Sequence, residues 1–199
     1  MRLRPILLVL LLAVFAWSMI RPHDWFTWGL EVFPAVIGLV LLFATYKRFP
    51  LTPLLIVLLF IHAVILIIGG HYTYALVPFG FWMQDAFGFT RNHYDRIGHF
   101  AQGFVPAILA REILIRKNVV RGTGWLFAIV LAFCLGFSAL YELLEWLVGA
   151  YAGDEGVAFL GTQGDVWDTQ KDMALALIGA AAAQLTLGRL HDRQIATLD

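Results

Sequence analysis

The chain has 199 residues, of which 60% are hydrophobic and only 14% are charged. An average soluble domain carries about 25% charged residues, so this composition excludes a soluble surface of ordinary polarity. Fourteen basic residues balance fourteen acidic ones, and no excess of positive charge points to nucleic acid as a partner. A single cysteine, Cys134, excludes an intrachain disulfide and a zinc site built from cysteines. We therefore expect an integral membrane protein.

Six apolar segments are each close to the length of about 20 residues that a helix needs to cross a bilayer. The predicted spans are residues 5–20, 28–46, 51–68, 97–115, 124–148 and 173–188. The first segment has an alternative as a signal peptide, because residues 16–18 weakly resemble a small-x-small cleavage site. The bulky side chains of Trp17 and Met19 favour a retained span. In the last segment, the small residues 179–183 let helix backbones approach closely.

Between the third and fourth spans, residues 69–88 are apolar but interrupted by Pro78, Gly80 and Gly88. The aromatic side chains of this stretch suit the membrane–water boundary. We expect a short interfacial or re-entrant segment there, and not a seventh span. Because the spans leave no room for a soluble domain, residues 1–199 are predicted to form a single transmembrane domain, an all-α bundle of about six helices.

Basic residues predict the orientation of the spans, because cytoplasmic loops carry an excess of lysine and arginine. Ten of the fourteen basic residues fall at one set of helix ends, which places both termini in the cytoplasm. Eleven of the fourteen acidic residues fall at the opposite, outer ends. The positive-inside rule does not account for this acidic excess, so the outer ends are the predicted functional side.

Asp95 and His99 stand four residues apart at the start of the fourth span, and Gln102 extends the same helical face. A carboxylate beside an imidazole can fix the tautomer of the ring for acid–base chemistry, or both groups can bind a metal. The alternative is an acid that favours the positive end of the helix dipole and a histidine that bonds to a neighbouring helix.

Two further acidic groups lie at the outer ends of the last two spans. Glu142 and Glu145 stand one helical turn apart, where like charges repel unless a cation or proton is shared between them. The alternative is that both carboxylates simply reach water. Asp165, Asp168 and Asp172 follow one face at the start of the last helix, where one or two of them would serve as ordinary caps.

The predicted topology brings these three groups to one level of the membrane. The candidate catalytic residues are Asp95, His99, Glu142, Glu145, Asp168 and Asp172. The candidate metal ligands are His99, Glu142, Glu145, Asp168 and Asp172. Imidazole and carboxylates without thiolates suit a divalent cation, with zinc, manganese and magnesium all open. Arg91, Arg96 and Lys171 are candidates to hold an anionic headgroup.

Other polar residues are expected to have structural roles. His62 lies in the middle of a span and is predicted to make a polar contact with another helix. His23 and His191 are interpreted as loop residues, and Cys134 as a small apolar side chain. The sequence contains no glycine-rich phosphate loop, nucleophile elbow or HExxH motif.

Three blocks of the sequence, residues 94–100, 141–146 and 164–172, resemble the YjdF-type family of predicted bacterial inner-membrane proteins. The resemblance extends over most of the chain, from the second span through the sixth. It implies a bacterial inner-membrane protein and specifies no activity.

A more distant resemblance is to the VanZ-like family, which is associated with glycopeptide-antibiotic resistance. The residues that match the pattern of that family are Asp95, His99, Phe100, Glu142 and Asp168, with Arg96 in place of a lysine. Glu145 stands where that family has a glutamine, and Asp172 where it has an asparagine. These differences make the corresponding site more acidic in this chain.

The sequence therefore predicts a multi-pass inner-membrane protein with an outward-facing polar pocket. The leading hypothesis is a membrane-embedded enzyme, dependent on a divalent metal ion, that acts on a lipid or cell-envelope precursor. One alternative is a small transporter or ion-coupled carrier, although transport sites usually lie near the bilayer midplane, where only His62 is ionisable. The other is a non-catalytic membrane partner whose polar residues form a structural network. No nucleic-acid partner is expected.

Overall fold

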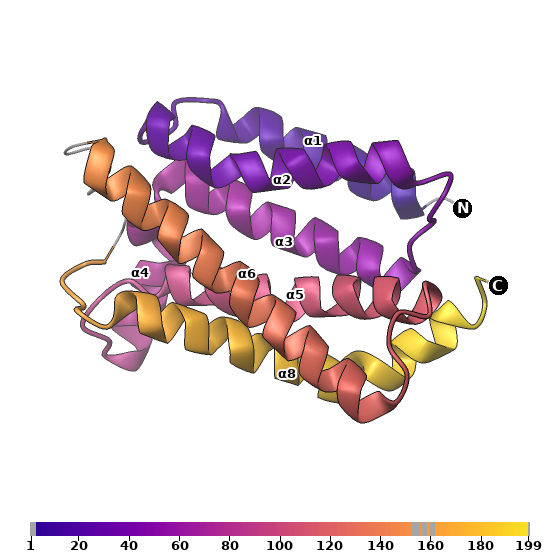
Figure 1. Ribbon diagram of the computed structural model, residues 1–199. Coiled ribbons are helices and arrows are strands. Elements are labelled where there is room, and N and C mark those ends of the chain that lie inside the picture. The colour runs from indigo at the N-terminus through magenta and orange to yellow at the C-terminus, as the bar shows by residue number, and fades with distance from the viewer. Residues whose placement is uncertain (1–2, 153–155, 157–158, 160–161, 199) are drawn as a thin grey trace. The chain divides into compact units, whose positions relative to one another are not determined.

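The computed structural model describes residues 3–152, 156, 159 and 162–198, and every regular element in this part of the chain is a helix (Figure 1). The helices are α1 (Leu3–Ser18), α2 (Trp25–Thr45), α3 (Pro53–Tyr72), η1 (Tyr74–Leu76), α4 (Pro78–Phe87), α5 (Tyr94–Arg116), α6 (Thr123–Tyr151) and α8 (Asp168–Ile195). The predicted all-α class is confirmed.

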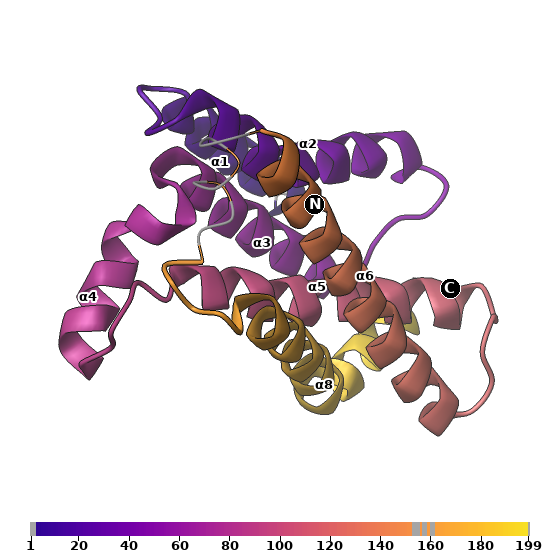
Figure 2. The ribbon, with the colours of Figure 1, turned by 60° about the vertical axis from the view of Figure 1, so that its left-hand side comes forward.

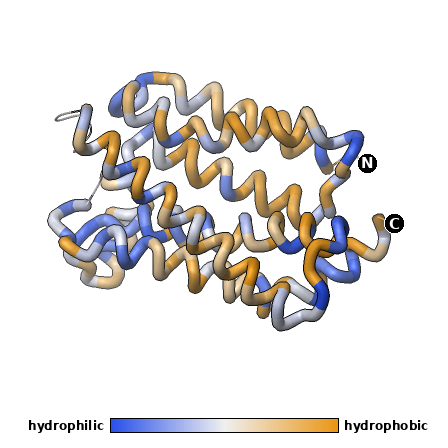
Figure 3. The backbone as a smooth tube through the Cα atoms, in the orientation of Figure 1, coloured by the Kyte–Doolittle hydropathy of each residue, from blue (hydrophilic) through white to orange (hydrophobic). Residues whose placement is uncertain are grey.

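Four helices, α2, α3, α6 and α8, are long and apolar enough to cross a membrane by length and composition. Hydrophobic residues make up most of their length, while hydrophilic residues concentrate at helix ends and connections (Figure 3). Helix α1 is apolar but has only 16 residues. Helix α5 has 23 residues and carries Asp95, Arg96, Arg111, Glu112 and Arg116, and it is not among the four. Together these helices roughly fit the six predicted spans.

The last helix is longer than its predicted span at both ends, because α8 has 28 residues. It begins at Asp168 and takes in His191 near its other end, so the interpretation of His191 as a loop residue is wrong. Residues 189–195 are mostly polar but contain no proline or glycine, and nothing in them ends a helix. The apolar stretch therefore marks where α8 meets lipid, not where the helix begins and ends.

The chain forms two compact units. The first unit comprises Met1–Ala44, Phe60–Gly98 and Leu143–Val166, and the second comprises Thr45–Leu59, His99–Glu142 and Trp167–Asp199. Helices α5 and α6 therefore contribute to both units, and so does α3.

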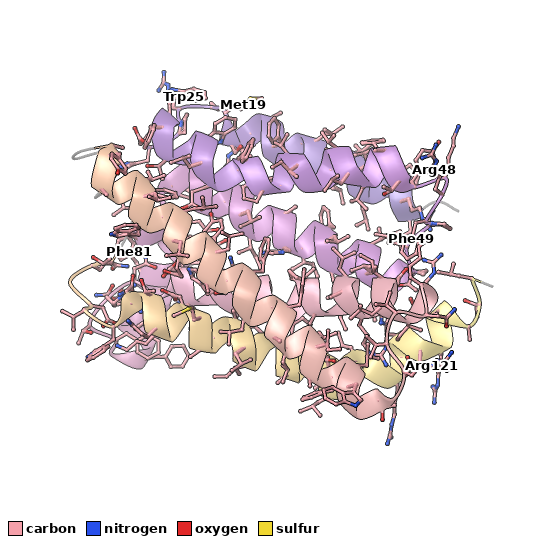
Figure 4. The ribbon with its side chains drawn as sticks, viewed as in Figure 1. Met19, Trp25, Arg48, Phe49, Phe81 and Arg121 are labelled. Atoms are coloured by element: carbon pink, nitrogen blue, oxygen red, sulfur yellow. The ribbon has the colours of Figure 1, made fainter. Side chains whose placement is uncertain are left out.

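In the first unit, the turn between α1 and α2 is fixed by side chains. The Thr27 amide donates to the Asp24 carboxylate, and this hydrogen bond lowers the pKa of Asp24. Trp28 Nε1 donates to Ser18 Oγ at 3.1 Å. Met19 and Trp25 are exposed at this end of the unit (Figure 4). Aromatic residues at the boundary of apolar helices are typical of a membrane–water interface.

The predicted segment after the third span forms η1 and the short helix α4, also in the first unit. A helix of 10 residues is about 15 Å long, which is too short to cross a bilayer. The prediction that this stretch is not a seventh span is confirmed. Asn92 fixes the start of α4, because its Nδ2 donates to the Val77 carbonyl at 3.0 Å. Gly80 allows this contact, since a Cβ there would overlap the Asn92 carboxamide.

In the second unit, α5 and α8 run side by side in close contact (Figures 1 and 2). A Cβ on Gly103 of α5 would overlap the Ala176 carbonyl of α8, and a Cβ on Gly179 would overlap the Phe100 carbonyl. The facing alanines of α8, Ala176 and Ala180 among them, are completely buried. Small residues thus let the two backbones touch, as the sequence predicted for residues 179–183.

Candidate functional site

The candidate site of the second unit is centred on His99 of α5, which is 6% exposed. Its Nδ1 lies 3.0 Å from Gln102 Oε1 and 3.7 Å from Glu142 Oε1 of α6. Its Nε2 lies 3.9 Å from Asp172 Oδ1 of α8. Carboxylates from two other helices therefore flank the two ring nitrogens.

These carboxylates are as buried as the histidine. Glu142 is 7% exposed and Asp172 is 2% exposed, and Asp168, one turn earlier on α8, is also buried. Charged groups removed from water are costly unless a proton or cation is shared between them. The structure thus brings together His99, Glu142 and Asp172, three of the residues predicted to form the site, and their chemical role stays a prediction.

The hydrogen bond to Gln102 determines what the other ring nitrogen can do. With the Gln102 carbonyl as acceptor, Nδ1 of His99 carries a hydrogen, and in the neutral ring Nε2 then has its lone pair on the side of Asp172. A lone pair and a carboxylate repel unless positive charge lies between them. A second proton on the imidazole or a metal ion bound to Nε2 would supply that charge.

The distance between His99 and Asp172 is close to that between two ligands of one cation. Two ligands of one tetrahedral zinc ion, each about 2.0–2.2 Å from the metal, lie about 3.3–3.6 Å from each other. The separation of 3.9 Å between Nε2 and Oδ1 is slightly longer. In such a site the Gln102 carbonyl would orient the imidazole by accepting from Nδ1, as partners of metal-bound histidines commonly do.

Two other predicted site residues, Asp95 and Glu145, belong to the first unit. Asp95 lies one helical turn before His99 on α5, and Glu145 one turn after Glu142 on α6. Both are partly buried. Their predicted roles as ligands or acid–base groups stay predictions.

The predicted headgroup residues Arg91 and Arg96 are in ion pairs within the first unit. Arg91 NH2 lies 3.7 Å from Asp95 Oδ2, and its NH1 donates to the Thr162 carbonyl at 2.7 Å. Asp165 lies 3.2 Å from Arg96 and 3.7 Å from Arg91. The two arginines thus balance acidic residues of the chain itself. Lys171, the third candidate, is exposed on α8 in the second unit.

A second buried polar cluster in the second unit was not predicted. Glu112 of α5 and His191 of α8 are both 0% exposed. Glu112 accepts from the Thr52 amide at 3.1 Å, the Thr52 hydroxyl at 2.7 Å and Arg116 at 2.9 Å. His191 Nε2 lies 3.0 Å from Glu112 Oε2, and Arg111 NH1 lies 3.3 Å from His191 Nδ1. Because arginine can only donate, Nδ1 accepts and Nε2 carries the hydrogen that Glu112 receives.

The sequence held weak signals for this cluster. Arg116 follows Glu112 by four residues, a spacing at which side chains on a helix meet. Glu112 is also an acid inside the predicted span 97–115, where an ionisable residue needs a partner. The partner on α8 lies about eighty residues away, and no local pattern indicates it.

Ser138 of α6 is another polar residue that sequence reasoning missed. It is completely buried, one turn before Glu142 on the same helical face, and its hydroxyl has no hydrogen-bond partner among the described residues. A serine among apolar neighbours in a span gives little signal in the sequence. Its position adds a hydroxyl to the face of α6 that carries Glu142.

Comparisons with known proteins agree with the predicted family. The sequence profile of a family described as "Predicted membrane protein (DUF2238)" matches residues 3–193. The inner membrane protein YjdF of Escherichia coli (strain K12) is 48% identical over 197 residues, covering 97% of this chain and 94% of that protein. No solved structure matches significantly. The resemblance to the VanZ-like family stays a prediction.

Several apolar helices and this similarity make the chain a multi-pass protein of the inner membrane. The resemblance to YjdF-type proteins, which rested on residues 94–100, 141–146 and 164–172, is confirmed over nearly the whole chain. The chain belongs to the DUF2238 family of predicted membrane proteins.

Proposed function

We propose that the chain is a membrane-embedded, metal-dependent enzyme that acts on a lipid or cell-envelope precursor at the outer leaflet. The observation that carries this proposal is the buried His99 flanked by the buried carboxylates of Glu142 and Asp172. Three helices are needed to assemble it. A structural hydrogen bond between helices would need one acceptor for the imidazole, and this ring faces two carboxylates in addition to Gln102.

The chemistry available to this site is acid–base catalysis with or without a bound cation. A divalent ion held by Nε2 of His99 and Asp172 would polarise a phosphoryl or carbonyl oxygen and lower the pKa of a bound water. Without a bound cation, Nε2 of His99 could accept a proton, and Glu142, on the Nδ1 side of the ring, would stabilise the positive charge that the imidazole gains.

The position of these residues along their helices favours a substrate at the membrane surface. His99 lies in the second turn of α5, which begins at Tyr94, and Asp172 in the second turn of α8, which begins at Asp168. Both are thus near helix ends, which we place at the depth of a lipid headgroup, whereas transport sites usually lie near the bilayer midplane. In the proposed orientation both termini are cytoplasmic, and these helix ends face outward.

Metal binding by the purified full chain tests the site. We expect a stoichiometric divalent metal after gentle purification in detergent, and a rise in thermal stability when zinc, manganese or magnesium is added to the stripped protein. At a concentration one hundred times Kd, binding to the folded state stabilises by about 2.7 kcal/mol. Asp172→Asn and His99→Gln should abolish this gain. Asp85→Asn, an exposed acid on α4, is the matched control and should keep it.

Product formation tests the enzyme. The wild-type protein would be incubated with an envelope lipid extract and the metal that it binds, and the lipids compared by mass spectrometry with those treated with Asp172→Asn. A lipid or precursor converted by wild type alone supports the proposal. Metal binding without conversion of any lipid would mean that the site is structural and not catalytic. A wild-type melting temperature that is the same with and without each metal would refute the metal site.

An ion-coupled carrier is the second candidate, favoured by one observation in the first unit. The Nε2 atom of His62 in α3 is buried and has no hydrogen-bond partner among the described residues. The polar contact predicted for this histidine is therefore not seen at that nitrogen. A buried imidazole inside a span can carry a proton. Proteoliposomes under a pH gradient would test this candidate, because flux that disappears in His62→Gln and persists in Asp172→Asn would favour a carrier.

A further inference from the structure

The short helix α4 carries an exposed aromatic face in the first unit. Phe79, Trp82 and Phe87 are each more than half exposed. At 100° per residue, Phe79, Trp82 and Met83 share one side of the helix and Phe87 lies at its edge. The rings of Phe79 and Trp82 are stacked, with centroids 5.4 Å apart, and Trp82 meets Phe87 edge-on. The apolar surface is thus continuous along α4.

One edge of α4, beside Phe87, is attached to the protein. Gly80 is buried, and a Cβ there would overlap the Asn92 carboxamide. Asn92 is 1% exposed and also holds the start of α5, because its Oδ1 accepts from the Tyr94 amide at 3.0 Å. Phe79 and Trp82 stand about 100° and 160° around the helix from Gly80, so this attachment leaves both aromatic side chains exposed.

Short connections keep α4 close to the membrane boundary. The span α3 ends at Tyr72 and α4 begins at Pro78, so five residues separate them (Figure 2). Five extended residues reach at most about 18 Å. After α4, only residues 88–93 precede α5. The helix therefore lies within reach of the interface where α3 leaves the lipid.

The sequence of α4 argues against insertion into the hydrocarbon core. Its second half carries Gln84 and Asp85, and an acid in the core is costly. The helix ends at Gly88, which has a φ of 67° and whose amide bonds to the Gln84 carbonyl. Glycine provides this left-handed turn without strain, and it ends the helix after about 15 Å, half the thickness of the core.

We propose that α4 lies flat in the membrane–water interface, with Phe79, Trp82 and Phe87 between the acyl chains and the headgroups, and that it is not re-entrant. The partner of this surface is the lipid bilayer itself. Because α4 has no lysine or arginine and a single acid, recognition rests on aromatic burial and not on attraction to anionic lipids. The anchor sets the membrane depth of the Asn92 turn, where the helix carrying His99 begins.

Spin labels on the full chain in phosphatidylcholine nanodiscs test this proposal. In a Cys134→Ala background, single labels would replace Phe79, Trp82 or Phe87 on the aromatic face, and Gln84 or Asp85 on the other. We expect the aromatic positions to be accessible to oxygen and protected from a water-soluble nickel chelate, and positions 84 and 85 to show the reverse. Trp82→Cys and Phe87→Cys provide the same readout if Phe79→Cys does not fold.

Each other result would overturn the proposal. Oxygen accessibility that rises steadily from position 79 to position 87 on both faces would show a re-entrant helix. Nickel access at every position would show a helix in water. Magnetic broadening between labels would show that a second copy of the chain covers the aromatic face. Replacing a third of the phosphatidylcholine with an anionic lipid should leave the accessibilities unchanged, and a large protection on its addition would refute recognition through aromatic burial.

Discussion

Replacing Glu112 with glutamine should strongly destabilise the protein. The side chain is 0% exposed, and its carboxylate accepts two hydrogen bonds from Thr52, one from Arg116 and one from His191. A hydrogen bond to a charged group contributes about 1.5–3 kcal/mol, and desolvation of the carboxylate offsets part of the sum. Removing one partner from a buried ionic network costs about 3–5 kcal/mol. We expect a loss in this range for Glu112→Gln, because its amide places N–H groups against donors.

The free energy of unfolding, measured by denaturant titration of the full chain in mixed micelles, checks this value. Thr52→Val removes one of the four donors and should cost about 1–3 kcal/mol. The double variant should lose less than the sum, because both changes break the same hydrogen bond. Asp85→Asn, exposed on α4, should stay within about 0.5 kcal/mol of wild type. A loss below about 1 kcal/mol in Glu112→Gln would show that this network does not stabilise the fold.

Three further predictions follow from single residues. Asp165→Asn should lower the melting temperature measured in detergent, because it leaves two arginines of the first unit beside an uncharged side chain. Ser138→Ala should raise the free energy of unfolding by about 1 kcal/mol, because it removes a buried hydroxyl that has no hydrogen-bond partner among the described residues. Calorimetry checks this value, and a lower stability of the variant would mean that the hydroxyl makes a hydrogen bond. In a Cys134→Ala background, a cysteine at Gln170 should be labelled from outside intact cells and one at Arg193 only after lysis; the reverse pattern would invert the proposed orientation.

The helices could be predicted because lipid leaves the backbone few choices. An apolar segment of about 20 residues must satisfy its peptide groups internally, and a helix does so. Helix ends follow other rules, because Asp168 and His191 both lie in α8 but outside the apolar stretch 173–188. Hydropathy identifies the part of a helix that contacts lipid. It does not detect the polar helical turns that extend beyond that part.

The two polar clusters of the second unit differ in how much the sequence indicated. His99, Glu142 and Asp172 come from three helix ends that the basic residues assign to one side, so topology alone suggested their convergence. The sequence assigns Glu112 and His191 to the side where basic residues are expected, and the positive-inside rule alone explains the neighbouring arginines. Their contact depends on how α5 packs against α8, which spacing along one helix does not show.

The packing of α5 against α8 is itself set by residues that lack side chains. Gly103 faces the carbonyl of Ala176, and Gly179 faces the carbonyl of Phe100. Lipid gives no hydrophobic driving force for two helices to associate, so close van der Waals contact carries much of the association. A methyl group at either glycine must push α5 and α8 apart. Because α5 carries His99 and α8 carries Asp172, the change would also separate these two side chains.

Gly103→Ala should therefore destabilise the protein, and Gly136→Ala provides the matched control. Nothing lies within 4 Å of a Cβ at Gly136 of α6, so that change should be neutral or gain up to about 1 kcal/mol in helix propensity. The same gain applies at Gly103, but overpacking against the α8 backbone costs about 1–3 kcal/mol or more. Unfolding titrations of both variants in the same micelles separate the two effects. Equal stability of Gly103→Ala and Gly136→Ala would mean that α5 and α8 are not in backbone contact at Ala176.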